Sequence, residues 1–183
     1  MSTRTPDDGT VTLGEHGAEV AFRRVYPTTP DDLWDAMTTP ARARRWLGAL
    51  QGDLRVGGTY ELRMGEDRAD ADDVARGQVL GCDPPRTLEL TWQFPGEQPS
   101  HVRVTVAQDA DGAVLTLVHA RLVERAARGY GGGWHVVLDQ LADHCAARPV
   151  RSWAELFDER AARYAGDAPN VTRTTGGAAP GAS

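Results

Sequence analysis

The stretch YGGGWHVVLDQLADHCAA, Tyr130 to Ala147, decides the fold of this chain. Its apolar residues recur at steps of three and four and therefore share one face of a 3.6-residue helix: Tyr130, Trp134, Val137, Leu138, Leu141 and Cys145. The opposite face is polar and carries His135, Asp139, Asp143 and His144. We expect His135 and Asp139, one turn apart, to form an ordinary surface pair. A helix with one apolar face must pack against a second layer, which the rest of the chain should supply.

Most of the chain before this helix alternates apolar with polar residues, the pattern of half-buried β-strands. The predicted strands are Val11 to Tyr26, Asp53 to Val56, Thr59 to Met64, Val74 to Leu80, Thr87 to Phe94, His101 to Val106 and Ala113 to Leu122. Turn pairs such as Gly57-Gly58 and Asp111-Gly112 favour hairpins between neighbouring strands. The sequence therefore predicts an antiparallel meander whose apolar face receives the Tyr130 helix.

Helix-start signals predict three further helices. Thr29-Pro30 followed by two aspartates is typical of a capped start, and Thr39-Pro40 repeats the signal ten residues later. Ser152 to Glu155 forms a capping-box pattern at the start of an amphipathic segment. We expect a disordered N-terminus at 1–10, one domain at 11–148, an appended helix at 149–165 and a disordered tail at 166–183. The acidic segment 65–73 lacks the ligand order of an EF-hand, so a solvated hairpin loop is predicted there.

Composition narrows the classes of function. A net charge of −6 argues against a general nucleic-acid surface, which needs a basic face. The two cysteines, Cys82 and Cys145, are too few for a disulfide scaffold and fit a reducing compartment. No apolar run approaches the length of a membrane span, and the first ten residues lack the apolar core of a signal peptide. We therefore expect a cytoplasmic protein with no nucleic-acid partner and no membrane insertion.

Several short motifs, in a defined order, carry a resemblance to a known family. They are Arg24-Val25-Tyr26, Leu33 to Ala36, Thr38-Thr39-Pro40, Arg45-Trp46, Leu54 to Gly58, Gly77-Gln78-Val79, Asp83 to Leu88, Thr91-Trp92, Leu115-Thr116-Leu117 and Gly133-Trp134. Together they resemble the activator of heat-shock-protein-90 ATPase homologue-like family of the START-like (SRPBCC) superfamily, over Val20 to Ala147. The resemblance implies an α+β helix-grip fold. In it, a curved antiparallel sheet of six or seven strands wraps around the C-terminal helix, two short helices follow strand one, and a cavity lies between.

A cavity of this kind favours binding of a small hydrophobic or amphipathic molecule. The candidate ligand-binding residues are inward side chains of strands and helices: Phe22, Trp34, Trp46, Tyr60, Leu62, Trp92, Val104, Leu117, His119, Trp134, Leu138 and Leu141. For each of them, filling the core is the simpler role. Whether the cavity is open or filled decides between the two.

Two other functions stay open at this point. Relatives that resemble cyclases, aromatases or hydrolases suggest catalysis in the same cavity, for which the inward His119 is the best candidate. An inward histidine is more often a hydrogen-bonded core residue. Because no nucleophile elbow, metal-ligand spacing or phosphate loop is found, we predict no catalytic residue, no metal and no cofactor. A homodimer, or a co-chaperone-like role with a protein partner, is the third alternative.

Overall fold

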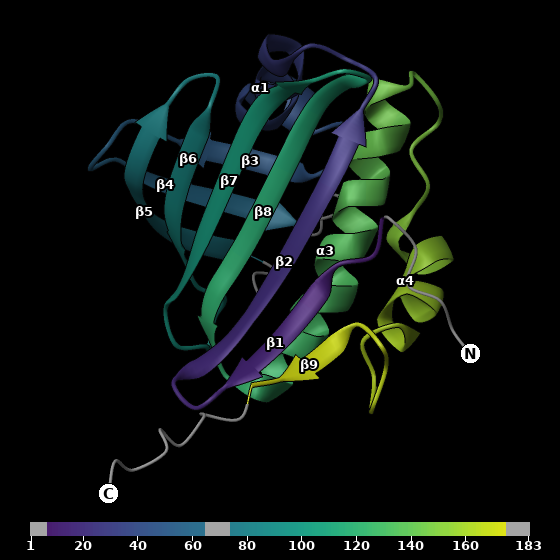
Figure 1. Cartoon of the computed structure of the whole chain (residues 1–183). Coiled ribbons are helices and arrows are strands. Elements are labelled where there is room, and N and C mark those ends of the chain that lie inside the picture. The colour runs from purple at the N-terminus through teal and green to yellow at the C-terminus, as the bar shows by residue number, and fades with distance from the viewer. Residues whose placement is uncertain (1–6, 65–73, 175–183) are drawn as a thin grey trace, which may run out of the picture.

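The computed structural model describes residues 7–64 and 74–174. The loop predicted at 65–73 lies outside the described residues, as do the predicted disordered ends at 1–6 and 175–183. Within the described part, one curved sheet of nine strands wraps around a long helix (Figure 1).

The sheet runs in the order β3-β4-β5-β6-β7-β8-β2-β1-β9. Its strands are β1 Thr10–Gly14, β2 Gly17–Tyr26, β3 Gly48–Gly52, β4 Thr59–Met64, β5 Val74–Asp83, β6 Thr87–Trp92, β7 Ser100–Asp109, β8 Gly112–Leu122 and β9 Val171–Arg173. Strands that follow one another in the sheet order from β3 to β8 pair antiparallel, as do β1 with β2 and β2 with the distant β8, whereas β9 lies parallel to β1.

Four helices accompany the sheet in the described residues: α1 Pro30–Thr38, α2 Pro40–Ala43, α3 Glu124–Cys145 and α4 Trp153–Ala162. Of the three predicted helix starts, those at Thr29 and Ser152 have side-chain caps, whereas Thr39 makes no side-chain capping hydrogen bond at the start of α2. The Thr29 hydroxyl accepts a hydrogen bond from the Asp32 amide, and Ser152 with Glu155 forms a complete capping box. Helix α3 lays Val137, Leu138 and Leu141 into the core, and the Tyr26 hydroxyl donates to the Leu138 carbonyl at 3.2 Å. The predicted arrangement of helix and sheet is confirmed.

Two strand predictions were wrong. The single strand predicted from Val11 to Tyr26 is a hairpin of β1 and β2, because Gly17, at φ 126°, turns the chain in a conformation that favours glycine. The strand predicted at Asp53 to Val56 is a turn, and the edge strand β3 lies just before it. Strand β3 lies at the sheet edge with its last two residues exposed, so it lacks the alternation that marks a half-buried strand.

The predicted disorder was also wrong where the structure describes the two ends. Strand β9 extends the sheet beyond β1, although its segment has almost no core of its own. Asp8 is buried and pairs with Arg163 at 2.8 Å, while the Gly9 amide donates to the Tyr164 hydroxyl at 2.9 Å. The two ends therefore order each other through contacts that neither end could make alone.

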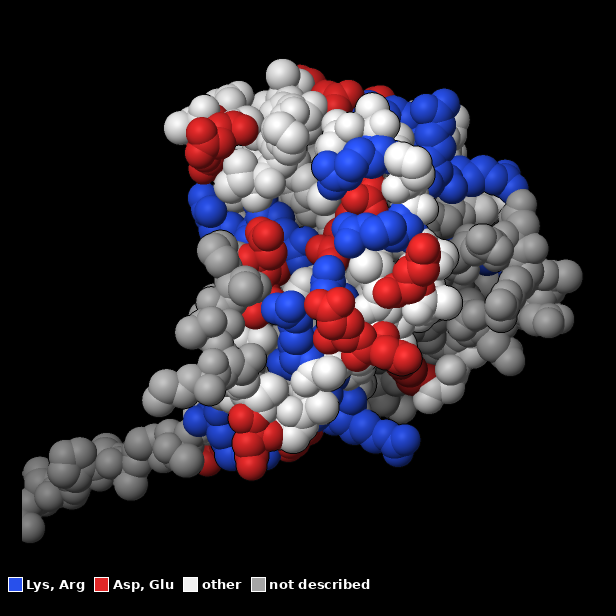
Figure 2. Space-filling model, turned by 90° about the vertical axis from the view of Figure 1, so that its right-hand side faces the viewer, with Lys and Arg blue, Asp and Glu red and all other residues white. Residues whose placement is uncertain are grey.

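The polar face of α3 is not a solvent-facing surface. Helix α4 and Tyr164 cover it, and His135, Asp139 and Asp143 are all buried. The Asp139 carboxylate accepts from Arg24 of β2 at 2.6 Å and from Arg160 of α4 at 2.7 Å. The expected surface pair of His135 and Asp139 is therefore part of a buried interface. On the side of the molecule that carries α4, basic and acidic side chains are interleaved (Figure 2).

The triple glycine of α3, Gly131 to Gly133, explains how α4 comes so close. A methyl group at Gly132 would stand 2.9 Å from the Ala161 Cα, and one at Gly131 would stand 2.8 Å from the Tyr164 ring. At Gly129, by contrast, no atom lies within 4 Å of the added methyl. Gly132 therefore allows the close approach of α4, and Gly131 that of Tyr164 just after it.

We expect Gly132→Ala to destabilise the protein by about 1–3 kcal/mol, because the methyl group overpacks the contact with α4. Gly129→Ala should instead leave stability unchanged or raise it by up to about 1 kcal/mol, since alanine is the better helix former and the space is open. Urea unfolding of both variants measures the two effects. Equal stability of the two variants would contradict the close contact.

Candidate functional site

A cleft of about 970 Å³ opens between α3, α4, the ends of β4 and β6, and the segment after α2. Its lining is Arg44, Arg45, Trp46, Leu47, Gly48, Met64, Trp92, Phe94, Glu97, Ala126, Gly129, Tyr130, Gly133, Trp134, Val137, Gln140, Val150, Arg151, Ser152, Trp153, Ala154 and Phe157. Helix α3 contributes the longest continuous wall, from Ala126 to Gln140. The cleft is therefore formed around the same helix that organises the fold.

Aromatic rings dominate the walls of this cleft. Trp92 and Trp134 pack with their ring centroids 5.2 Å apart, at the base of β6 and on α3. Trp153 and Phe157 stack at 5.1 Å on α4, and Trp153 is 43% exposed. Part of the Trp153 ring therefore stays exposed beside the cleft.

Only part of the predicted ligand-binding set meets here. Trp46, Trp92 and Trp134 line the cleft. The other predicted residues are buried in the core and are not part of this lining: Phe22, Trp34, Tyr60, Leu62, Val104, Leu117, His119, Leu138 and Leu141. Ligand contact by any of them stays a prediction. Their hydrophobic character placed them inside the protein, but did not show which of them the cleft reaches.

Sequence reasoning left out several residues of the lining. Tyr130 and Val137 belong to the helix face that was recognised, and Trp153 and Phe157 to the capping-box helix. Their helical spacing was a usable signal, because each pair shares one face. The position of α4 beside the cleft was not predictable from that spacing, since it depends on contacts with α3.

His119 is buried beside the cleft and belongs to a chain of hydrogen bonds that runs from Trp134 to the Trp92 carbonyl. Trp134 Nε1–H donates to His119 Nδ1 at 3.0 Å, which makes Nδ1 an acceptor. The neutral ring then carries its proton on Nε2, 2.7 Å from Ser100 Oγ, and the Ser100 hydroxyl donates to the Trp92 carbonyl at 2.9 Å. Burial lowers the pKa of His119 to about 3, so the ring is neutral at ordinary pH.

These directions matter for chemistry. To act as a base toward Ser100, His119 would need a free lone pair on Nε2 and a proton on Nδ1. That proton would point at the indole N–H of Trp134, so two donors would face each other. The pair therefore holds Trp134 and the end of β6 in place and does not activate the serine.

The polar group at one end of the cleft is Tyr130 with Glu97. The Tyr130 hydroxyl donates to a Glu97 carboxylate oxygen at 2.6 Å and accepts from Trp92 Nε1–H at 3.1 Å. Burial and this carboxylate raise the pKa of Tyr130 far above its usual value. Tyr130 is therefore a neutral hydrogen-bonding residue of the wall.

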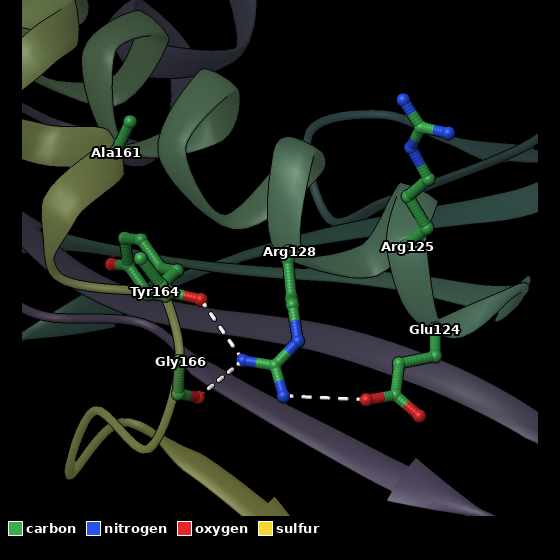
Figure 3. A pocket seen from close by; sticks show the side chains of 7 residues that line it. Glu124, Arg125, Arg128, Ala161, Tyr164 and Gly166 are labelled. Carbon is green, nitrogen blue, oxygen red and sulfur yellow. Dashed lines mark hydrogen bonds and ion pairs between the residues drawn. The ribbon is translucent and has the colours of Figure 1, made fainter.

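A second hollow of about 640 Å³ lies between the start of α3 and the end of α4 (Figure 3). Arg128 crosses it and donates to the carbonyls of Tyr164 and Gly166 at 3.2 and 2.6 Å, and to Glu124 at 3.3 Å. Arg125 points away from this group. Since the Arg128 guanidinium is bonded to the protein itself, we interpret it as a residue that holds the chain after α4 in place.

Within the described residues, no group of three or more histidine, cysteine or acidic side chains is arranged to hold a metal ion. Likewise, none of the described helices has the length and apolar character needed to span a bilayer.

The chain was compared with known families and structures. Residues 27–146 match the model of the family described as Activator of Hsp90 ATPase homolog 1-like protein. The chain belongs to this family. A search among curated proteins found no match.

Several solved structures are similar to this chain in fold. The crystal structure of CalU16 from Micromonospora echinospora is 29% identical, with a TM-score of 0.68, over 86% of this chain and 93% of that one. A protein from Bordetella parapertussis is 30% identical, with a TM-score of 0.65, over 80% and 84% of the two chains. DynU16, a protein of the dynemicin biosynthetic locus, shares the fold at 22% identity, with a TM-score of 0.63, over 73% of this chain and 49% of that one. The predicted family and helix-grip fold are confirmed.

The buried histidines predict how stability depends on pH. Burial lowers the pKa of His119 to about 3 and that of His135 to about 4, whereas an unfolded histidine titrates near 6.5. Between pH 6.5 and 4 the unfolded chain therefore takes up protons that the folded chain excludes. The free energy of unfolding should fall on acidification, by on the order of 3 kcal/mol for each group at pH 4.

The variant His119→Gln tests this prediction. An amide can accept from Trp134 and donate to Ser100 but does not titrate, so the loss between pH 7 and 4.5 should become shallower. Urea unfolding at the two pH values measures it. An unchanged dependence of the unfolding free energy on pH would show that His119 takes up a proton as readily in the folded as in the unfolded chain.

Proposed function

We propose that this protein binds a small, largely aromatic, amphipathic molecule in the cleft between α3 and α4. One observation carries the proposal: seven aromatic side chains line a cleft of about 970 Å³, namely Trp46, Trp92, Phe94, Tyr130, Trp134, Trp153 and Phe157. Binding sites for small molecules have volumes of roughly 300–1,000 Å³ and are lined mainly by apolar and aromatic groups with a few polar ones.

The apolar walls of the cleft favour contact with a ligand over contact with water. The stacked pair of Trp153 and Phe157 lies beside the cleft on α4. Each Å² of apolar surface that a ligand removes from water there contributes about 25 cal/mol. A planar ligand between this pair and the Trp134 wall would cover apolar surface on both sides. Aromatic contacts would add to that gain.

The catalytic alternative has less support. A hydrolase would need a nucleophile with a base, and the hydrogen bonds of Ser100 and His119 run in the wrong direction for that role. A cyclase- or aromatase-like activity, a homodimer and a co-chaperone-like partner stay predictions. The aromatic cleft supports binding of a small ligand and gives none of these three any support beyond that.

Substitutions at Gly133 test the proposal. A methyl group there would lie 3.5 Å from the Trp153 ring, an ordinary contact, so further atoms would extend into the cleft. Gly133→Phe should lower the affinity for the neutral dye N-phenyl-1-naphthylamine at least tenfold, because its ring occupies the space of the ligand. Gly133→Ala is the matched control and should bind nearly as well as the unmodified protein.

Dye fluorescence measures the affinity, and urea unfolding verifies that both variants are folded. Dye binding that is equal in Gly133→Phe and Gly133→Ala would place the bound dye elsewhere. A complete lack of dye binding by the unmodified protein would also contradict the proposal.

A further inference from the structure

The two ends of the cleft differ chemically. Tyr130 and Gln140 both line it and lie ten residues apart on α3, a separation of about 15 Å at 1.5 Å per residue. The Tyr130 end holds Glu97, bound by the tyrosine hydroxyl. The other end is basic and its lining carries Arg44, Arg45 and Arg151.

Contacts with the last turns of α3 place these arginines at the Gln140 end. Arg151 Nε donates to Asp143 at 2.8 Å, and Asp143 lies three residues beyond Gln140. Arg42 of α2 lies three residues before Arg45, and its Nη2 is 3.5 Å from His144 Nε2. Both basic segments of the lining are therefore held at the C-terminal end of α3.

Among the described residues, the charges of Arg45 and Arg151 at this end are only partly compensated. Asp143 already accepts hydrogen bonds from Arg148 and Arg151, so its single charge is shared between two guanidinium groups. Within the described part of the chain, the Arg45 side chain makes no hydrogen bond or ion pair, and only its backbone amide is bonded, to the Arg42 carbonyl at 3.0 Å. Among the described residues that line the cleft, Glu97 is the one carboxylate, and it belongs to the opposite end.

We propose that the ligand is an elongated aromatic molecule with one anionic group, which binds at the Arg45 and Arg151 end of the cleft. This inference rests on the proposed function and adds the polarity and orientation of the ligand. A carboxylate or sulfonate would gain a charge-assisted hydrogen bond there. Glu97 disfavours a reversed orientation, because it would place two negative charges together. Its carboxylate instead favours a hydrogen-bond donor at the far end of the ligand.

Two dyes with the same ring system separate charge from shape. 8-Anilinonaphthalene-1-sulfonate carries a sulfonate, and N-phenyl-1-naphthylamine is the neutral parent. The unmodified protein should bind the sulfonate about tenfold more tightly, the ratio expected for one hydrogen bond to a charged group. Affinities are compared at one ionic strength, because salt weakens exposed charge interactions.

Arg45→Gln should lower the affinity for the sulfonate about tenfold and leave the neutral dye unchanged. Arg45→Lys keeps the charge and should restore part of the preference. Arg125→Gln is the matched control: it changes the net charge equally, but Arg125 is exposed and outside the cleft. It should alter neither affinity.

The outcomes distinguish the two proposals. If both dyes bind equally, or if Arg125→Gln and Arg45→Gln act alike, the ligand polarity is overturned while the cleft can still bind, as Gly133→Phe would show. If neither dye binds, the proposed function fails and the polarity with it. A sulfonate preference that Arg45→Gln removes and Arg45→Lys partly restores supports the inference.

Discussion

The cleft depends on the docking of α4 against α3, at the Asp139 carboxylate held between Arg24 and Arg160. Burial alone would raise the pKa of Asp139, but these hydrogen bonds lower it, so the group is ionised. The cost of burying such charges offsets much of their attraction, and a buried ion pair is weak evidence for net stability. Arg24 even keeps Nε and Nη2 without hydrogen-bond partners among the described residues. The contact therefore contributes mainly to where α4 sits.

Gly131 and Gly132 allow α4 and Tyr164 to approach α3 closely. With no Cβ on either residue, Ala161 and Tyr164 approach the α3 backbone closely and gain dispersion contacts that compensate for glycine in a helix. The Tyr164 hydroxyl also meets the His135 ring at 2.8 Å and the Gly9 amide at 2.9 Å. A polar anchor and a close apolar approach thus fix the same helix. Consequently, Trp153 and Phe157 are held beside the cleft.

Helix α3 therefore serves three neighbours with three stripes of its surface. Leu138 and Leu141 pack into the sheet, Asp139 and Asp143 bind arginines, and Trp134 lines the cleft. Because Trp134 also donates to His119, the cleft wall is tied to the strands beneath it. A neutral histidine suits this role, since it offers one donor and one acceptor within a buried site.

The sequence predicted the local elements well because their signals are local. Caps at Thr29 and Ser152, hairpin turns and the apolar face of α3 are set by residues a few positions apart. The polar face of α3 and the tail misled the prediction, because their burial depends on partners distant in sequence. Asp139, for example, is ion-paired to Arg24, which lies 115 residues away.

One signal for this interface was nevertheless present in the strand. Phe22, Arg24 and Tyr26 have the same parity in β2, so an arginine shares the inward face with two aromatic residues. A buried arginine needs a carboxylate, and the nearest inward surface is α3. The alternation that predicts a core strand therefore also predicts that the acidic face of α3 is covered. Because α4 covers that face, its Trp153 and Phe157 share the lining of the cleft with Trp134 of α3.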